Sequence, residues 1–375
     1  MKQSNLQLIF KKYIDNFERI NDDKNDENYK WEIAEHFQNF DLDTPNFAEE
    51  LERLWKLSDN LIDNYRQLPF YALVDYAKHE PEKVREMFKK LFNAADLIPE
   101  LKQKSIEEFI AESETLRQKY RPYSHLYINN QRSVMMYLFL RYPNTNYAYK
   151  ASQAKSFADC VEFYEDWGPM TDFKLETYYR FCDQLVEEVK NCEELVQTHL
   201  SRYENTTKKL YSDDNFHILV FDIIYSSQAY NLLDGITYNP INMQARKLYF
   251  EKLAKAEELK VNLEKITKDS ELLEEAKCYF KEGLEKVGFV QHKSWGIGKI
   301  KSIENSHVVV DFPSQTEEKK IGLAFTLINK IIRIDLEDFD GYLEKYSDVL
   351  KREAEIPNAL KRAEDAIKPY LEFLE

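Results

Sequence analysis

The sequence predicts a mainly α protein: a multi-helix N-terminal domain, a small five-stranded SH3/Tudor-like β-barrel and a C-terminal helical segment. Only 8 glycines occur among 375 residues, which favours helix because sheets and tight turns consume glycine. Apolar residues recur at helical spacing through most of the chain. Five of the eight glycines, however, fall within 283–322, where the apolar pattern changes to strict alternation.

Four segments are expected along the chain. They are a helical domain at 1–235, a helical hairpin or spacer at 236–284, the barrel at 285–335 and C-terminal helices at 336–375. In the first segment, Thr44 and Pro45 have the chemistry of an N-cap and a first helical residue, and Pro81 repeats that design. No internal repeat of solenoid period is found.

Five short strand candidates make up the expected barrel. They read FVQHKSW, GKIKSIE, HVVVDF, KKIGLAF and KIIRI, and turn residues separate them. Five strands in about fifty residues are typical of a small barrel. The turn after the first candidate is no phosphate loop, because Lys293 occupies the position of the required upstream glycine and Ile300 that of the Ser or Thr. Gly296 and Gly298 are interpreted as turn-forming residues.

The charge distribution singles out the same segment. The whole chain carries a net charge of −15, which argues against coating nucleic acid through bulk charge. Residues 286–334 carry eight cations and four anions, so this segment has a charge of +4 and the remainder −19. A basic island on an acidic chain predicts a surface for nucleic acid or for an acidic protein.

Two sets of residues are candidates for binding nucleic acid or another partner. The main set comprises His292, Lys293, Trp295, Lys299, Lys301, Lys319 and Lys320. The secondary set comprises Arg141, Tyr142, Tyr147, Tyr149 and Lys150. The tyrosines of the secondary set have the chemistry to stack on bases, and core packing in a Tyr-rich chain is the alternative.

Catalytic signatures are sparse in this sequence. HExxH, CxxC and GxSxG are absent, and no metal or cofactor is expected. Asp311, Glu317 and Lys319 form a superficial D…ExK arrangement like that of Mg²⁺-dependent nucleases, which keeps a divergent nuclease as an alternative. Asp222, within an apolar run, is expected to be a capping or paired buried carboxylate. Unpatterned cysteines, no apolar run of membrane-spanning length and no cleavable leader favour a cytoplasmic protein.

The N-terminal segment resembles the helical region upstream of the AAA+ motor in some McrB-type restriction proteins. The matching stretches are YKWEIAEHFQNFDLDTPNFAEEL, EPEKVREMFKKLF, LFLRYPNTNYAYKASQAKSF and HILVFDIIYS. The chain departs from that family because no AAA+ motor follows the region. The resemblance therefore implies a non-enzymatic recognition or adaptor protein of restriction-type anti-phage defence, working with a separately encoded motor or nuclease.

The barrel segment resembles the Tudor-like, RNA-polymerase-interacting modules of UvrD-type helicases, transcription-repair coupling factors and CarD-like regulators. The resemblance is carried by the H-x-x-x-G-I-G turn, from His292 to Gly298, and by the VVVDF and KKIGLAF strands. Such modules bind polymerase or nucleic acid and are not enzymes. The resemblance implies, as an alternative function, a transcription-associated factor that docks on RNA polymerase through the barrel.

Overall fold

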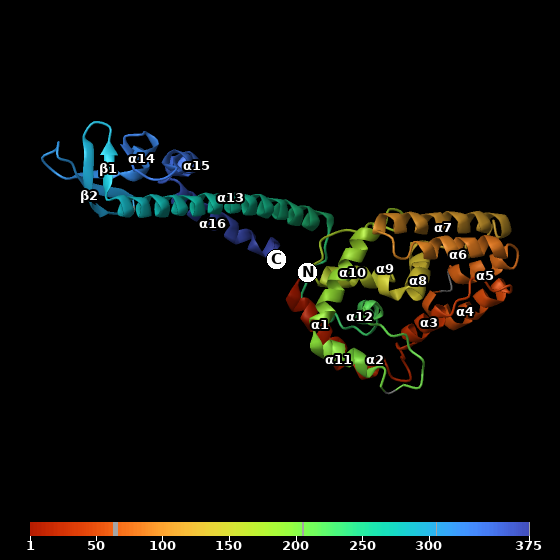
Figure 1. The fold of residues 1–375 in the computed structure, drawn as a ribbon. Coiled ribbons are helices and arrows are strands. Elements are labelled where there is room, and N and C mark those ends of the chain that lie inside the picture. The colour runs from red at the N-terminus through yellow and green to blue at the C-terminus, as the bar shows by residue number, and fades with distance from the viewer. Residues whose placement is uncertain (63–66, 205, 305, 375) are drawn as a thin grey trace. The chain divides into compact units, whose positions relative to one another are not determined.

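The computed structural model describes residues 1–62, 67–204, 206–304 and 306–374. Within these ranges it contains sixteen α-helices and one five-stranded antiparallel sheet, which confirms the predicted mainly α fold with a small barrel-like sheet (Figure 1). The chain forms two compact units, 1–246 and 247–375. None of the described helices has the length and apolar character needed to cross a membrane.

The N-terminal unit is a stack of short helices. Its elements are α1 Gln3–Asp15, α2 Phe17–Ile20, α3 Tyr29–Gln38, α4 Phe47–Ile62, α5 Pro69–Ala77, α6 Pro81–Asn93, α7 Pro99–Tyr120, α8 Gln131–Arg141, η1 Pro143–Thr145, α9 Ala151–Cys160, α10 Leu175–Lys190, α11 Glu193–Ser201 and α12 His217–Ala229. Helix α6 begins at Pro81 as predicted, because proline already has a helical φ and its missing N–H is not needed there. Helix α4 begins at Phe47, two residues after Pro45.

Aromatic rings fill the core of the N-terminal unit. The ring of Phe88 packs against Phe40 at 5.3 Å and against Phe109 at 5.4 Å, both edge to face, and Tyr137 completes the cluster. Edge-to-face packing lets the positive ring edge meet the negative face of its neighbour. The high tyrosine and phenylalanine content of the sequence is thus used for packing between short helices.

One group of charged side chains is buried in this core. Lys30 is fully buried and pairs with Asp222, also fully buried, and with Glu27 at 2.8 Å. Tyr13 donates its hydroxyl to Asp222, and Arg202 donates to the Tyr13 hydroxyl at 3.1 Å. Two cations therefore face two carboxylates away from water, and each charge has partners that offset its desolvation. The expected pairing of Asp222 is confirmed.

His199 lies beside this group and stays neutral. Its ring packs against Trp31 at 5.8 Å and edge-on against Tyr203 at 5.5 Å. Burial, reinforced by the positive charge of Arg202, lowers the pKa of His199 to about 3. The guanidinium of Arg202 itself lies 3.6 Å from the centroid of the Trp31 ring, where the negative ring face attracts it.

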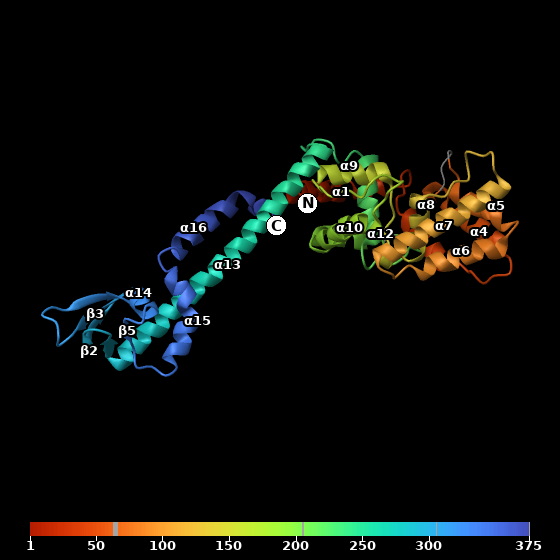
Figure 2. The ribbon, with the colours of Figure 1, turned by 90° about the horizontal axis from the view of Figure 1, so that it is seen from above.

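The C-terminal unit is built on one long helix. Helix α13, Met243–Val287, is continuous over 45 residues, so the segment expected as a hairpin or spacer contains no turn. The remaining elements are β1 Phe289–His292, β2 Gly296–Ile303, β3 His307–Asp311, β4 Lys319–Gly322, α14 Leu323–Ile328, β5 Ile332–Arg333, α15 Phe339–Lys351, α16 Ile356–Ile367 and η2 Lys368–Phe373. Helix α16 and η2 return along α13, where the ring of Tyr249 meets Phe373 at 5.7 Å (Figure 2).

The five strands form a curled sheet in the order β4-β3-β2-β1-β5. The inner face carries Val290, Val308 and Val310, all buried against Phe280 and Leu284 of α13. Three strand candidates are shorter by three residues each than the sequence predicted. FVQHKSW contributes only Phe289–His292, the LAF of KKIGLAF begins helix α14, and KIIRI contributes only Ile332–Arg333. Since successive side chains of a strand alternate between faces, the outer face is fixed by the same register.

Candidate partner-binding face

The turn between β1 and β2 is held by His292. Its Nδ1 accepts hydrogen bonds from the backbone N–H groups of Ser294 and Trp295, both at 3.1 Å. Nδ1 is therefore the acceptor, which leaves the proton on Nε2. Gly296 follows with a φ of +79°, a conformation that side chains with a Cβ disfavour. The predicted turn role of Gly296 is confirmed.

Gly298 is required by close packing, whereas Gly296 is required by its backbone conformation. A Cβ at Gly298 would lie 2.5 Å from the ring of Phe312 and 2.5 Å from Cγ1 of Val310, so the residue is glycine because the inner face is closely packed there. The ring of Trp295 stacks on His292 with centroids 3.9 Å apart and meets Phe312 edge to face at 5.4 Å. The H-x-x-x-G-I-G motif is thus a self-contained aromatic hairpin.

Two members of the main candidate set, His292 and Trp295, supply the rings of that hairpin. His292 is 8% exposed, and burial lowers its pKa. One face of the Trp295 indole is covered by His292, and the Trp295 carbonyl accepts a hydrogen bond from Ser314 at 2.8 Å. The structure therefore gives His292 and Trp295 a role in shaping the turn, whereas the lysines of the set are left at the surface.

The lysines do not share one face. Lys299 points outward, opposite Asp311 of β3. Lys301, at a bulge in β2, forms an ion pair with Asp311 at 3.3 Å. Lys320 points outward and pairs with Glu304, whereas its neighbour Lys319 lies opposite the buried Val310 and so points to the inner side.

Most cations of the basic island have no carboxylate partner. Among the described residues, five of its eight cations form no ion pair within 4 Å, namely Lys286, Lys293, Lys299, Lys319 and Lys330. Lys293 is exposed next to β1, where its backbone N–H donates to Ile331 at 2.8 Å. Lys293 and Lys299 are thus the unpaired cations nearest to the outer face of β1 and β2.

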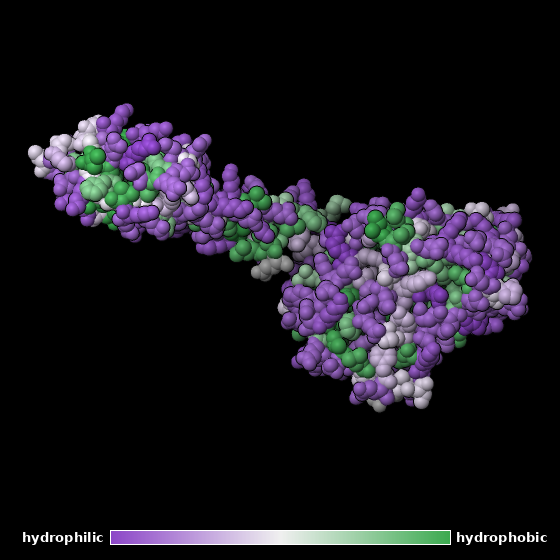
Figure 3. Space-filling view, viewed as in Figure 1, coloured by the Kyte–Doolittle hydropathy of each residue, from purple (hydrophilic) through white to green (hydrophobic). Residues whose placement is uncertain are grey.

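The outer face also carries two apolar residues that sequence reasoning did not single out. Phe289 of β1 is 49% exposed and Ile297 of β2 is 65% exposed. Together with Val287 and Arg333 they line a hollow of about 600 Å³. Figure 3 shows hydrophobic residues over β1 and β2, surrounded by hydrophilic ones. The sequence carries a signal for them, because an apolar residue stands on each side of the alternation, Phe289 beside Val290 in β1 and Ile297 close to Ile300 in β2.

The secondary candidate set is largely buried, which corrects its interpretation as a stacking surface. Tyr147 is 3% exposed, stacks on His217 at 4.1 Å and donates to Asp183 at 2.6 Å. Tyr149 is 5% exposed and accepts from Trp167 at 3.1 Å. Neither ring has a free face for a base, so core packing is the reading that the structure supports.

The remaining three residues of that set are partly buried and also engaged. Arg141 donates to the carbonyls of Phe37 and Gln38, and its guanidinium lies 5.6 Å from the Tyr142 ring. Lys150 donates to the Leu61 carbonyl at 2.8 Å, and burial lowers its pKa to about 8. These side chains join helices to one another, which explains why cations and tyrosines occur together in this stretch.

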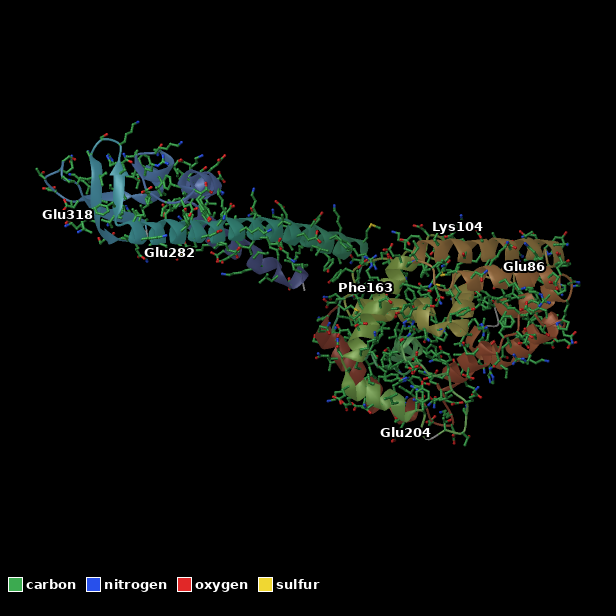
Figure 4. The ribbon with its side chains drawn as sticks, in the orientation of Figure 1. Glu86, Lys104, Phe163, Glu204, Glu282 and Glu318 are labelled. Carbon is green, nitrogen blue, oxygen red and sulfur yellow. The ribbon has the colours of Figure 1, made fainter. Side chains whose placement is uncertain are left out.

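The nuclease-like arrangement is not assembled. Asp311 is held by Lys301, and Lys319 points to the opposite side of the sheet. Glu317 is exposed in the loop before β4, next to Glu318, which Figure 4 labels. Over the described ranges, no three His, Cys, Asp or Glu side chains come together in a way that would hold a metal ion.

Comparisons with protein-family models, with curated proteins and with solved structures find no match to this chain. The two resemblances noted in the sequence stay predictions.

Proposed function

We propose that the protein is a non-enzymatic adaptor that docks on a partner through the outer face of its small sheet. The observation that supports this most directly is the pair of exposed apolar side chains, Phe289 and Ile297, beside the unpaired cations Lys293 and Lys299. An apolar centre with a charged rim is the usual composition of a protein–protein contact. Folding of the sheet does not require exposed apolar side chains on its outer face.

The biological setting proposed for this adaptor comes from the resemblance of its N-terminal segment to the McrB-type helical region. In that setting the N-terminal unit takes part in nucleic-acid-associated recognition, and the sheet recruits a separately encoded motor or nuclease of a restriction-type defence system. The proposed N-terminal role is compatible with a helical unit whose aromatic and charged residues are largely used for packing.

Docking on RNA polymerase is a second candidate function. It is favoured by one observation, the curled five-stranded antiparallel sheet with an aromatic hairpin at Trp295, which is the element on which the resemblance to polymerase-interacting modules was based. In this function the helices of the N-terminal unit act as a scaffold. The two candidates share the docking face and differ in the identity of the partner.

Affinity purification from native lysate, with and without nuclease treatment, tests the proposal. We expect a defined partner, identified by mass spectrometry as a motor or nuclease subunit or as RNA polymerase, to remain bound after nuclease treatment. The double variant Lys299→Glu/Lys301→Glu reverses charge on the outer face and is expected to release it. The double variant Lys260→Glu/Lys281→Glu, with both changes at exposed positions of α13, is the charge-matched control.

Two results would contradict the proposal. If the Lys299→Glu/Lys301→Glu variant retained every partner, the outer face of the sheet would not be part of the contact. If every partner were lost on nuclease treatment and DNA retention fell steeply with salt, the lysines would be binding phosphates and not a protein.

A further inference from the structure

We infer that the outer face of β1 and β2 is a groove for an acidic protein segment that inserts an apolar side chain between Phe289 and Ile297. This inference rests on the proposed docking function and specifies the chemistry of the partner. It is carried by the register of the strands, by the exposure of the two apolar residues and by the distribution of charge around them.

The strand register brings the apolar residues together. Gln291 of β1 pairs with Ile297 of β2, and Phe289 pairs with Lys299. Phe289 and Ile297 are therefore diagonal neighbours on one face, a separation that an aromatic side chain can bridge. They lie in the hollow of about 600 Å³ that Val287 closes at the end of α13. The groove is deep enough to receive a side chain and apolar enough to favour a hydrophobic one.

The inner core does not account for these two residues. Val290 and His292, which alternate with Phe289 along β1, already point inward and are buried. Placing a phenylalanine and an isoleucine on the solvent side adds nothing to that core. Water contact with both side chains is unfavourable, and a partner side chain that covers them would recover that free energy.

The charge around the groove selects an acidic segment. Lys299 lies directly opposite Phe289, and Lys293 follows β1, and neither forms an ion pair with a described residue. Arg333 also lines the hollow but is held by Asp340 at 3.3 Å, and Asp335 lies beside it. The cations available to a partner are therefore Lys299, which is paired with Phe289 across the strands, and Lys293, which follows β1; both lie outside the lining of the hollow. A partner with carboxylates flanking its apolar residue would complement these two cations.

A nucleic acid fits the same face less well. Binding of single strands uses several aromatic faces in succession, and Phe289 is the exposed ring in this groove, because Trp295 is stacked on His292. An isoleucine offers no stacking face.

The inference can be tested by selecting peptides on the full-length protein. A displayed library of short random peptides is panned against the wild type, and the bound sequences are compared with the unselected library. We expect enrichment of peptides that combine net negative charge with a large aliphatic or aromatic residue. Phe289→Ser and Ile297→Ser are each expected to weaken binding of a selected peptide by at least about tenfold, as for loss of a central anchor.

Controls separate loss of contact from loss of folding. Phe325 of α14 is 67% exposed but does not line the hollow, so Phe325→Ser should leave peptide affinity unchanged. Lys299→Glu should disfavour acidic peptides and leave the circular dichroism spectrum as in the wild type. Rescue of Lys299→Glu by a peptide with its acids changed to lysines would identify the complementary charge.

Three outcomes would overturn the inference. They are selected peptides without acidic or apolar bias, tighter binding of a short DNA duplex or single strand than of any peptide, and self-association of the protein that Ile297→Ser abolishes. The first outcome leaves the docking function standing if the affinity-purified partner is still released by charge reversal at Lys299 and Lys301. If peptide selection succeeded but the purification released no partner on charge reversal, the proposed function would be contradicted. The inference that the groove binds an acidic segment would still stand.

Discussion

Charged side chains are used in opposite ways in the two units. In the N-terminal unit, Lys30 and Asp222 are both fully buried, and they are enclosed by Tyr13 and Arg202. In the C-terminal unit, the side chains of Lys301 and Asp311 are 43% and 50% exposed and their pair lies on the face of a sheet. The same type of ion pair therefore lies in the interior of one unit and on the solvent-exposed surface of the other.

The comparison shows which charges are free to bind a partner. A buried pair is tied to its neighbours, because removing one partner leaves the other charge without compensation. A surface pair contributes little to stability and exchanges easily with water or with another molecule. Function through charge is therefore expected on the sheet, and stability through charge in the helical unit.

Asp222→Ala is expected to have the largest effect. It leaves Lys30 without its closest partner, and the N-terminal unit should lose about 3–5 kcal/mol of unfolding free energy. Hydrogen exchange measured by mass spectrometry reports the two units separately. The double variant Lys30→Met/Asp222→Leu removes one buried charge of each sign, so the net charge of the group is unchanged, and the N-terminal unit should lose less unfolding free energy than with Asp222→Ala. Equal losses for the single and double variants would show that packing, and not charge, governs this core.

Gly298→Ala tests the closest packing of the C-terminal unit. A Cβ there meets Phe312 and Val310 at 2.5 Å, so the sheet should lose up to about 3 kcal/mol, with no change in the N-terminal unit. Gly322→Ala in β4 is the matched control, because its nearest neighbour would be 4.0 Å away. Urea unfolding followed by hydrogen exchange makes the measurement. A neutral Gly298→Ala would mean that the aromatic hairpin can shift.

The unfolding free energy of the N-terminal unit should depend on pH through the buried His199. His199 has a pKa of about 3 when folded and an ordinary value of about 6.5 when unfolded, so the unfolded state binds more protons between these pH values. The contribution of neutral His199 to the unfolding free energy is therefore fully present above pH 6.5 and decreases as the pH falls toward 3. Between pH 7 and pH 5 the loss should be about 2 kcal/mol, from the linkage of proton binding to folding.

The His199 contribution is isolated by a difference. Asp213 has a pKa raised by burial to about 6, which gives the opposite slope between pH 6 and pH 4. Comparing the wild type with His199→Leu at each pH removes that contribution, since Asp213 is common to both. Parallel curves for the two proteins would mean that folding does not lower the pKa of His199.

The smallest effect is expected at the surface pair. A double-mutant cycle on Lys301→Ala and Asp311→Ala should give an interaction below about 1 kcal/mol, and salt should reduce it further. The same variants are expected to alter binding of the partner more than stability. An interaction as large as that of the buried pair would contradict the distinction between the two units.

The sequence was sufficient to predict the main architecture and the hairpin turn. Helical spacing, Pro81 and the change to alternation after Gly283 are local signals, and local signals determine local structure. The sequence left two readings of the secondary tyrosines open, base stacking and core packing, because burial of Tyr147 depends on His217 and Asp183, which are distant in sequence. Which face of β1 and β2 is buried is decided by packing against α13, so the strand pattern alone does not tell the exposed Phe289 and Ile297 from the buried Val290.

The strand order has a consequence for behaviour at high concentration. The two outermost strands of the sheet are β4, which carries Lys319 and Lys320, and β5, which has two residues. Lysines and short length at the borders of a sheet discourage it from extending into a neighbouring molecule by main-chain pairing. The sheet can therefore expose an apolar face for recognition and still resist polymerising into fibres, which a docking module needs to remain available to its partner.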